Sequence, residues 1–157
     1  MTLAPHRPPL AFTDMDGVAA AIRAAGGRLS TVRRLLLEAL FAADTPVTAE
    51  QLAEGLGGLT LPTELSSVYR NLEALEALGV VRHLHGGHGA GLYTLERERR
   101  VEYLVCEKCH RIDAIDAERL DGLRASIEES FGYRTRFDHF PIVGLCPACC
   151  ELQRPTP

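Results

Sequence analysis

Apolar residues recur at helical spacing through the first half of the chain. A helix is predicted from Asp14, which can cap its N-terminus, to the glycine pair at 26–27. Three more helices are predicted over residues 28–40, 48–56 and 63–78. The apolar stripe of the last helix consists of Leu65, Val68, Leu72, Leu75 and Leu78.

Cap signals mark the beginnings of two of these helices. Thr48 is followed three residues later by Gln51, the spacing of a capping box, in which each side chain bonds the other residue's backbone. Thr63 stands where it can cap the next helix, which Gly79 ends.

Beyond the last of these helices the pattern changes from helical to alternating. Residues 80–85 and 92–95 predict two short strands, and the glycine-rich stretch between them predicts a hairpin tip. Helices followed by a β-hairpin are typical of a winged helix-turn-helix. In that arrangement the helix at 63–78 would enter the major groove of DNA, and the hairpin would contact the DNA backbone.

The second half of the chain has a different character. Strands are predicted at 102–105, 111–116 and 133–143, with an amphipathic helix at 117–131. The apolar face of that helix consists of Leu120, Leu123, Ile127 and Phe131. This region is too small for a comfortable core of its own, and a zinc site and a partner subunit are the usual remedies.

The predicted fold class is therefore α+β, in two domains. A proline-rich arm without periodicity, at 1–13, precedes a winged-helix domain at 14–95. A charge run at 96–100 is interpreted as a linker. The small α/β domain occupies residues 101–157.

Four of the five cysteines form two Cys-x-x-Cys pairs, Cys106 with Cys109 and Cys146 with Cys149. Two such pairs give four sulfur ligands, the tetrahedral set that zinc prefers in a structural site. A four-thiolate site has no open coordination position, so we expect it to hold the chain together rather than to catalyse. The alternatives are two disulfides or unrelated buried thiols. Cys150 is either a spare thiol or an alternate ligand.

Composition limits the partners of the chain. Of 157 residues, 46% are hydrophobic and 24% are charged, which is enough to fold around a core. The net charge of −4 is not that of a protein that coats nucleic acid indiscriminately, so any DNA contact must use local basic clusters. No apolar run is long enough to span a membrane, and no signal core follows the N-terminus. Together with the cysteine pairs, this predicts a cytoplasmic protein.

Basic and polar residues gather at the starts of two predicted helices. Arg28, Arg33 and Arg34 could pair with phosphates, which sets affinity but not sequence preference. Side chains off the apolar stripe of the helix at 63–78 could reach phosphates or base edges, namely Ser67, Tyr69, Arg70 and Asn71. The alternative is a solvated helix face. The first 95 residues hold seven Arg, no Lys and nine acidic residues, a net charge of −2 that favours binding as a dimer.

The motifs match a known family along nearly the whole chain after the arm. They are Arg28-x-Ser30-x-x-Arg33, Ser67-Val68-Tyr69-Arg70-Asn71-Leu72-x-x-Leu75-x-x-x-Gly79, Leu104-Val105-Cys106-x-x-Cys109 and Gly144-Leu145-Cys146-x-x-Cys149. In these motifs the chain resembles the ferric uptake regulator superfamily of bacterial metal-responsive repressors. The resemblance implies a homodimer with an N-terminal winged-helix DNA-binding domain and a C-terminal α/β dimerisation domain holding zinc on four cysteines. It also implies a sensory metal between the domains, which closes the dimer onto operator DNA.

The chain departs from this family at the sensory ligands. The family usually carries His-His-Asp/Glu-His ahead of the first cysteine pair, where this chain has Arg100-Val101-Glu102-Tyr103. Only the carboxylate of Glu102 remains. Before the second pair, Asp138 stands where histidine is common, and His139 is one residue away. The family's usual sensory ligands therefore cannot be carried over to this chain.

A second group of histidines could replace them. His83, His85 and His88 lie in and around the predicted hairpin, and His83 and His85 share one strand face. Imidazoles suit zinc, nickel, copper or ferrous iron, and Glu96 or Glu102 could complete the ligand set. The alternative is that these histidines are exposed near DNA phosphates and hold no metal.

The sequence thus predicts a dimeric, metal-responsive transcriptional repressor of double-stranded operator DNA, with structural zinc and a second regulatory metal ion, for which zinc is preferred. One alternative keeps the fold but has degenerate metal sensing and responds to iron and peroxide or to thiol redox. Another is a zinc-stabilised adaptor that binds protein. An enzyme is not expected, because the four-thiolate site lacks an open position and no nucleophile–base pair is present.

Overall fold

The computed structural model describes residues 14–85, 89–96, 100–137 and 140–152. The chain divides into two compact units, one of Met1–His83 with Leu92–Glu98 and the other of Leu84–Gly91 with Arg99–Pro157. The predicted arm lies outside the described residues. Of the described residues next to the predicted hairpin tip, Leu84, His85 and 89–91 group with the second unit.

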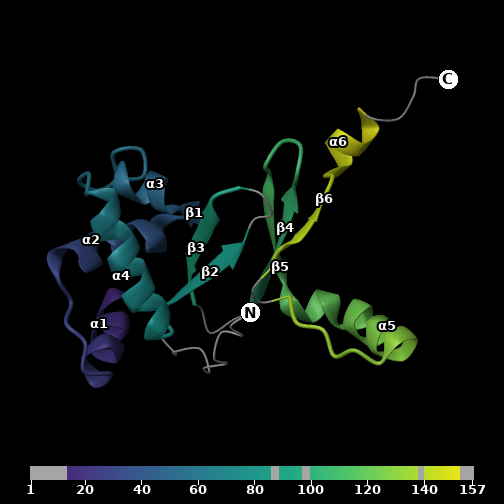
Figure 1. Ribbon diagram of the computed structural model, residues 1–157, viewed down its shortest axis with the longest axis horizontal. Coiled ribbons are helices and arrows are strands. Elements are labelled where there is room, and N and C mark those ends of the chain that lie inside the picture. The colour runs from purple at the N-terminus through teal and green to yellow at the C-terminus, as the bar shows by residue number, and fades with distance from the viewer. Residues whose placement is uncertain (1–13, 86–88, 97–99, 138–139, 153–157) are drawn as a thin grey trace. The chain divides into compact units, whose positions relative to one another are not determined.

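Four α-helices build most of the first unit (Figure 1). They are α1 (Met15–Ala24), α2 (Thr31–Ala42), α3 (Ala49–Ala53) and α4 (Leu65–Ala77). The predicted cap of α1 is confirmed, since Asp14 accepts a hydrogen bond of 2.7 Å from the Gly17 N–H. Ser30 caps α2 in the same way, through the Arg33 N–H at 3.3 Å.

Of the two other predicted helix caps, the one at α3 is confirmed and the one at α4 is not. The capping box at the start of α3 is confirmed, with Thr48 and Gln51 each bonding the other's backbone. The predicted cap of α4 is wrong: the N-cap residue is Glu64, which makes no side-chain cap bond. The Thr63 hydroxyl instead donates to the Leu61 carbonyl at 3.4 Å. A local turn thus competes with the cap for this hydroxyl.

α3 is also shorter than the sequence predicts. It ends at Ala53, because the chain then turns through left-handed conformations at Gly55 (φ 83°) and Leu56 (φ 48°). A Cβ added at Gly55 would lie 2.2 Å from the Thr60 carbonyl oxygen, so the turn requires glycine at this position.

A three-stranded sheet, most of whose residues belong to the first unit, has the order β1 (Val47–Thr48), β3 (Gly91–Leu95) and β2 (Val81–His85). β1 pairs antiparallel with β3, with Val47 opposite Tyr93. The predicted order of helices followed by two paired strands is therefore observed. The stripe of α4 faces the core through Val68, Leu72 and Leu75, all at 0% exposure, while Leu65 is exposed and Leu78 is half-buried.

The second unit is built on a mixed sheet in the order β5 (Ile112–Asp116), β4 (Val101–Cys106) and β6 (Ile142–Gly144). β4 and β5 pair antiparallel across a short turn, and β6 pairs parallel to β4. A parallel neighbour needs a crossover connection, which here contains α5 (Asp121–Phe131). A short helix, α6 (Pro147–Glu151), follows β6.

Two predicted elements of this unit need correction. The helix predicted at 117–131 begins as a 3₁₀ turn over Ala117–Leu120 and becomes α-helical at Asp121, although Gly132 ends it as expected, with φ 72°. The strand predicted at 133–143 is reduced to β6 in the described residues. Pro141, directly before β6, has no N–H to donate to a ladder, so it cannot continue the pairing.

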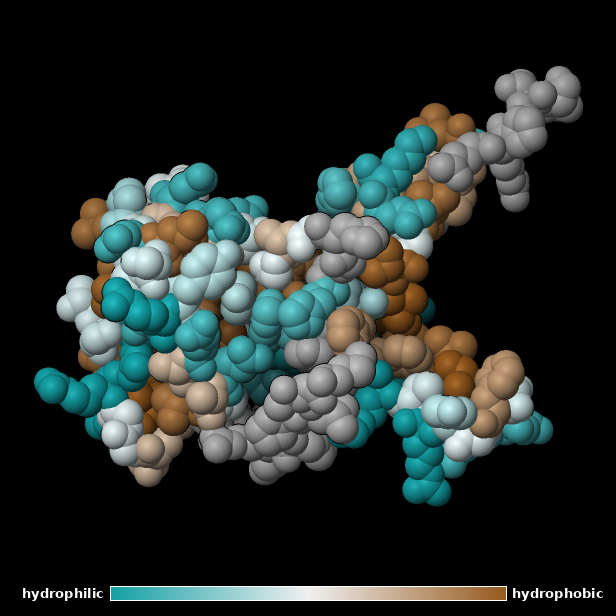
Figure 2. Space-filling view, viewed as in Figure 1, coloured by the Kyte–Doolittle hydropathy of each residue, from teal (hydrophilic) through white to brown (hydrophobic). Residues whose placement is uncertain are grey.

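The predicted apolar face of α5 is at most half-buried by the described part of the chain. No residue of α5 is buried, and Leu123 and Phe131 are exposed. Leu104, Tyr133, Phe140 and Val143 of the same unit are exposed as well. Figure 2 shows brown, hydrophobic side chains at the surface of this sheet and at α5. Among the helices described, none has the length and apolar character that crossing a membrane would require.

Candidate metal centre and nucleic-acid interface

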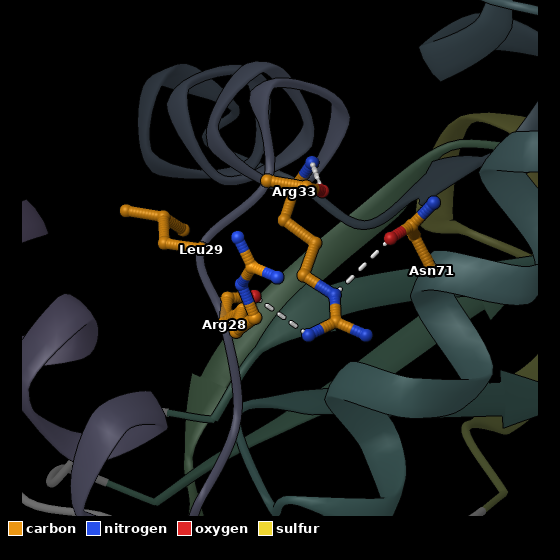
Figure 3. A pocket seen from close by; sticks show the side chains of 5 residues that line it. Arg28, Leu29, Arg33 and Asn71 are labelled. Atoms are coloured by element: carbon orange, nitrogen blue, oxygen red, sulfur yellow. Dashed lines mark hydrogen bonds between the residues drawn. The ribbon is translucent and has the colours of Figure 1, made fainter.

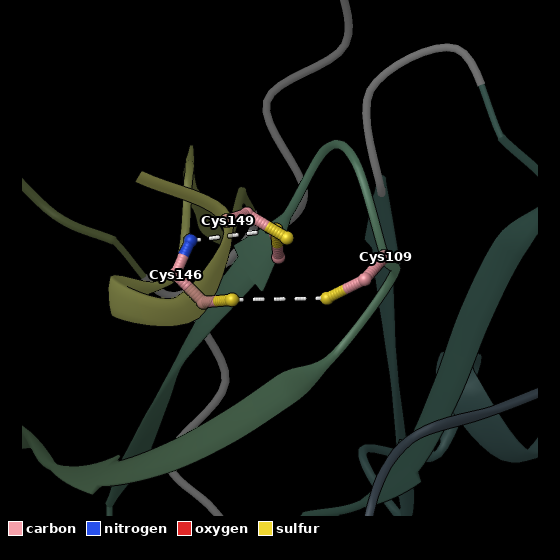
Figure 4. Close-up of side chains that lie close together, drawn as sticks. Cys109, Cys146 and Cys149 are labelled. Atoms are coloured by element: carbon pink, nitrogen blue, oxygen red, sulfur yellow. Dashed lines mark hydrogen bonds between the residues drawn. The ribbon is translucent and has the colours of Figure 1, made fainter. Parts of the chain in front are cut away.

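The structure brings the four paired cysteines together in the second unit. Cys106 ends β4, Cys109 lies in the turn before β5, Cys146 is the N-cap of α6, and Cys149 lies within α6. Their sulfur atoms all lie within 4.8 Å of one another. Figure 4 shows the thiols of Cys109, Cys146 and Cys149 pointing toward one another from the two facing segments.

The spacing of these sulfur atoms fits one zinc ion. The Cys109 and Cys146 sulfur atoms are 3.7 Å apart. Four sulfurs placed about 2.3 Å from a tetrahedral zinc ion would be separated by about 3.8 Å. All five cysteines are free thiols, so the disulfide alternative is not observed. The residues present therefore fit a structural zinc ion.

Backbone groups prepare this site. The Glu107 N–H donates to the Gly144 carbonyl at 2.9 Å, which joins the two cysteine loops, and the Cys146 N–H donates to the Cys106 sulfur at 3.4 Å. His110 adopts a left-handed φ of 59°, which lets its N–H bond the Cys106 carbonyl and close the first loop. The loops thus bring the sulfurs together through backbone bonds.

Two of the thiols have pKa values that are shifted in opposite directions. The backbone N–H of Cys109, followed by that of Cys146, lowers the pKa of Cys106 to about 6, so this thiol is ionised at neutral pH. Burial, and then hydrogen bonding with the other thiols, raises the pKa of Cys149 to about 12. Metal ligands must be thiolates, so metal binding at this site releases protons.

Cys150 lies outside this group. It is exposed, and its thiol points to the Leu145 carbonyl at 3.5 Å. The sulfur that lies close to those of Cys106, Cys109 and Cys146 belongs to its neighbour, Cys149.

The candidate sensory histidines that the structure describes each lie against an aromatic ring. His83 stacks on Tyr93 in the first unit, with ring centroids 4.7 Å apart and planes 6° from parallel. His85 belongs to the second unit, where its ring lies 5.7 Å from that of Phe140. Of the residues that the structure describes, the four cysteines are the one group of three or more metal-ligating side chains. His88, Asp138 and His139 lie outside the described residues.

Glu102 and Glu96, the carboxylates considered for the sensory site, both pair with arginine. Glu102 is 1% exposed and lies 3.2 Å from the Arg124 guanidinium. Glu96 lies 4.0 Å from Arg82. Arg124 carries no motif and stands 22 residues after Glu102, so sequence reasoning did not find it.

Residues expected to contact DNA line a hollow of about 300 Å³ at the start of α2, formed by Arg28, Leu29, Ser30, Arg33 and Asn71. Figure 3 shows the Arg33 side chain between the Arg28 backbone and the Asn71 side chain. Arg33 donates from Nε to Asn71 Oδ1 at 3.1 Å and from Nη1 to the Arg28 carbonyl at 2.7 Å. Asn71 in turn donates to the Ser67 carbonyl at 2.8 Å. Arg33 and Asn71 thus join α2 to α4.

The other candidate residues are more accessible. Arg28, Arg34, Tyr69 and Arg70 are exposed. Tyr69 lies on α4 and donates from its hydroxyl to Glu50 of α3 at 3.0 Å. This bond raises the pKa of Tyr69, while the Glu50 backbone N–H and then Tyr69 lower the pKa of Glu50. The face of α4 opposite its buried stripe therefore presents a guanidinium and a phenol held in a fixed position.

Comparisons with known proteins agree with this arrangement. The model of the Ferric uptake regulator family matches residues 24–139. The peroxide-responsive repressor PerR of Staphylococcus epidermidis is 21% identical over 138 residues, which is 88% of this chain and 91% of that protein. The ferric uptake regulation protein of Bacillus subtilis is 31% identical over 88 residues, which is 54% of this chain and 59% of that protein.

Solved structures share the fold. The ferric uptake regulator Fur of Helicobacter pylori superposes with a TM-score of 0.68 at 17% identity, over 87% of this chain and 91% of that one. Fur of Vibrio cholerae superposes with a TM-score of 0.66 at 23% identity, over 82% of this chain and 99% of that one.

Proposed function

The chain belongs to the ferric uptake regulator family, and we propose that it is a homodimeric, metal-responsive transcriptional repressor that binds double-stranded operator DNA. The observation that carries this proposal is the exposed face of α4. Tyr69 and Arg70 project from a helix whose other face is fully buried, so the helix is a rigid support for groups that reach outward.

In the proposed complex, α4 enters the major groove and Arg70 contacts phosphates or base edges. Arg28 and Arg34, both exposed near the start of α2, pair with phosphates. Arg33 and Asn71 act through their mutual bond, which sets the angle between α2 and α4. The net charge of −4 keeps non-specific binding weak, so a dimer with two half-sites is needed for useful affinity.

Zinc on Cys106, Cys109, Cys146 and Cys149 is the structural part of this proposal. The sulfur spacing supports it, and the four ligands leave no position for substrate, so an enzymatic role is not proposed. When bound, a zinc ion would supply a cross-link between the β4–β5 turn and α6. We propose that the exposed apolar residues of α5 and its sheet form the dimer contact, since this unit buries little on its own.

Regulation by a second metal ion, with zinc preferred, remains a prediction for His83, His85, His88 and Glu102. The Helicobacter pylori relative is described with three functional metal-binding sites, and the Staphylococcus epidermidis relative is named as peroxide-responsive. A second candidate is a repressor of the same fold with degenerate metal sensing, which responds to iron and peroxide or to thiol redox. The pairing of Glu102 with Arg124 favours this candidate. As a DNA-binding repressor of a bacterial family, the protein would act in the cytoplasm.

Gel-shift titration tests the DNA-binding part. Duplexes from the region upstream of the chain's own gene are titrated with zinc-loaded wild type, Arg70→Ala and the control Arg134→Ala, which removes an exposed arginine of the other unit. We expect Arg70→Ala to weaken binding about 10- to 100-fold, the effect of losing one base-edge or charged contact, with zinc content unchanged. Absence of wild-type binding to any upstream duplex would instead support a protein-binding adaptor.

A further inference from the structure

Arg124 makes several contacts within the second unit. Its Nη1 donates to the Ala117 carbonyl at 2.7 Å and to Asp121 at 2.9 Å. Its Nη2 donates to Glu102 of β4 at 3.2 Å. The guanidinium carbon also lies 5.4 Å from the centre of the Phe137 ring. One cation therefore ties β4, the 3₁₀ turn and the start of α5 together.

Glu102 is the partner that requires this cation. Its side chain is 1% exposed, and a buried carboxylate is costly unless an opposite charge or several hydrogen bonds compensate it. Two other arginine–carboxylate pairs of this unit are of a different kind. Arg111 with Asp113, and Arg134 with Glu128, lie at the surface with all four side chains at least 39% exposed.

Glu102 is also the one residue that this chain keeps from the family's sensory stretch. A divalent ion bound at about 2.1 Å to Oε1, which Arg124 Nη2 contacts, would lie within about 5.3 Å of that nitrogen, and one bound to Oε2 would lie within about 7.5 Å, because the two oxygens of a carboxylate are only about 2.2 Å apart. A guanidinium does not lose its proton in proteins, so the two cations would repel each other. Glu102 belongs to no group of three metal-ligating side chains in the described part of the chain. The described residues around Glu102 therefore do not fit a sensory metal.

We infer that Arg124 is a built-in counter-cation, which occupies the place at Glu102 where a metal-sensing relative would bind an ion. The link between β4 and α5 is then permanent, and it does not respond to metal supply. Any metal response must come from ligands other than Glu102. This consequence for regulation rests on the proposed function, whereas the role of the guanidinium within the unit does not.

A rescue experiment tests the charge role. Unfolding by urea is measured for the zinc-loaded full chain, as wild type, Arg124→Ala, Arg124→Ala/Glu102→Gln and the control Arg134→Ala. We expect Arg124→Ala to lower the folding equilibrium constant about 10- to 100-fold, and the added Glu102→Gln to restore most of this loss, because it removes the uncompensated charge. A side chain that mattered only for packing would show no rescue, and that result would overturn the inference.

A metal titration provides an independent test that does not depend on the stability of the Arg124 variants. Mn²⁺ and Zn²⁺ are titrated into the zinc-loaded wild type and into Glu102→Gln. We expect both proteins to bind any further ion with the same affinity, within about twofold. An affinity that falls tenfold or more in Glu102→Gln would make Glu102 a metal ligand and contradict the inference. Neither test uses DNA, so a failure of DNA binding would be distinguishable from a failure of this inference.

Discussion

Two places in the second unit satisfy buried negative charge in different ways. Both involve β4, which carries Glu102 near its start and Cys106 at its end. Around Cys106, four thiols from two loops gather, and we propose that a zinc ion compensates their charge. Around Glu102, the chain supplies the cation itself through Arg124. Under this proposal the first site makes folding depend on metal, and the second makes the β4–α5 link independent of it.

The largest expected effect comes from breaking the thiol site. Cys106→Ser removes one of four ligands, and metal binding at such a site is folding energy. We expect the second unit to lose several kcal/mol of stability, measured by urea unfolding of this unit. Cys150→Ser is the matched control, because its sulfur lies outside the group. Equal stability of the two variants would contradict a structural role for zinc at Cys106.

Acidification should affect the proposed zinc ion at the cysteines but not the Arg124 guanidinium at Glu102. Protons compete with zinc for thiolates, whereas a guanidinium stays charged throughout this range. The raised pKa of Cys149, about 12, means that zinc must displace a proton from this thiol throughout the neutral range, and Cys106, with a pKa of about 6, takes up a further proton in acid. Zinc affinity should therefore fall continuously as the pH drops, and more steeply below about 6. A chromophoric chelator would record the zinc released at each pH. Zinc affinity that stays constant down to pH 5 would show that the thiolates are not the ligands.

Substituting the histidines of β2 tests whether a second metal regulates the protein through them. If a second metal acts through them, His83→Ala/His85→Ala should reduce the effect of added zinc on operator affinity about tenfold, the loss typical of removing ligands or their immediate supports. Urea unfolding of the double variant controls for the loss of the His83 stack on Tyr93. A stable double variant with an unchanged metal response would remove these residues from the sensory hypothesis.

The smallest expected effect is at the exposed edge of the Arg124 cluster. Asp121 bonds Arg124 at 2.9 Å, but its side chain is 71% exposed. Surface ion pairs contribute roughly 0–1 kcal/mol, so Asp121→Asn should change stability by no more than that. A loss as large as that of Arg124→Ala in the same urea assay would mean that Asp121, and not Glu102, is the partner that matters.

The sequence predicted those features that depend on residues close together in the chain. The two Cys-x-x-Cys pairs, the Thr48–Gln51 capping box and the glycine that ends α5 each follow from a spacing of a few residues. The stripe of α4 was predicted from periodicity, and its three central residues are fully buried.

The features that the sequence missed depend on longer distances or on local competition. Arg33 and Asn71 are 38 residues apart, and Glu102 and Arg124 are 22 apart, so no local pattern connects either pair. The Thr63 cap failed because a nearby carbonyl takes its hydroxyl. These contacts give Arg33 and Glu102 partners within the chain that residue type alone does not indicate.

The most direct test of the central claim is the metal count of the wild-type protein by native mass spectrometry, after brief treatment with a chelator at neutral pH. The account predicts one retained zinc ion per chain in a folded dimer, held by Cys106, Cys109, Cys146 and Cys149. A folded dimer that retains no zinc would contradict it.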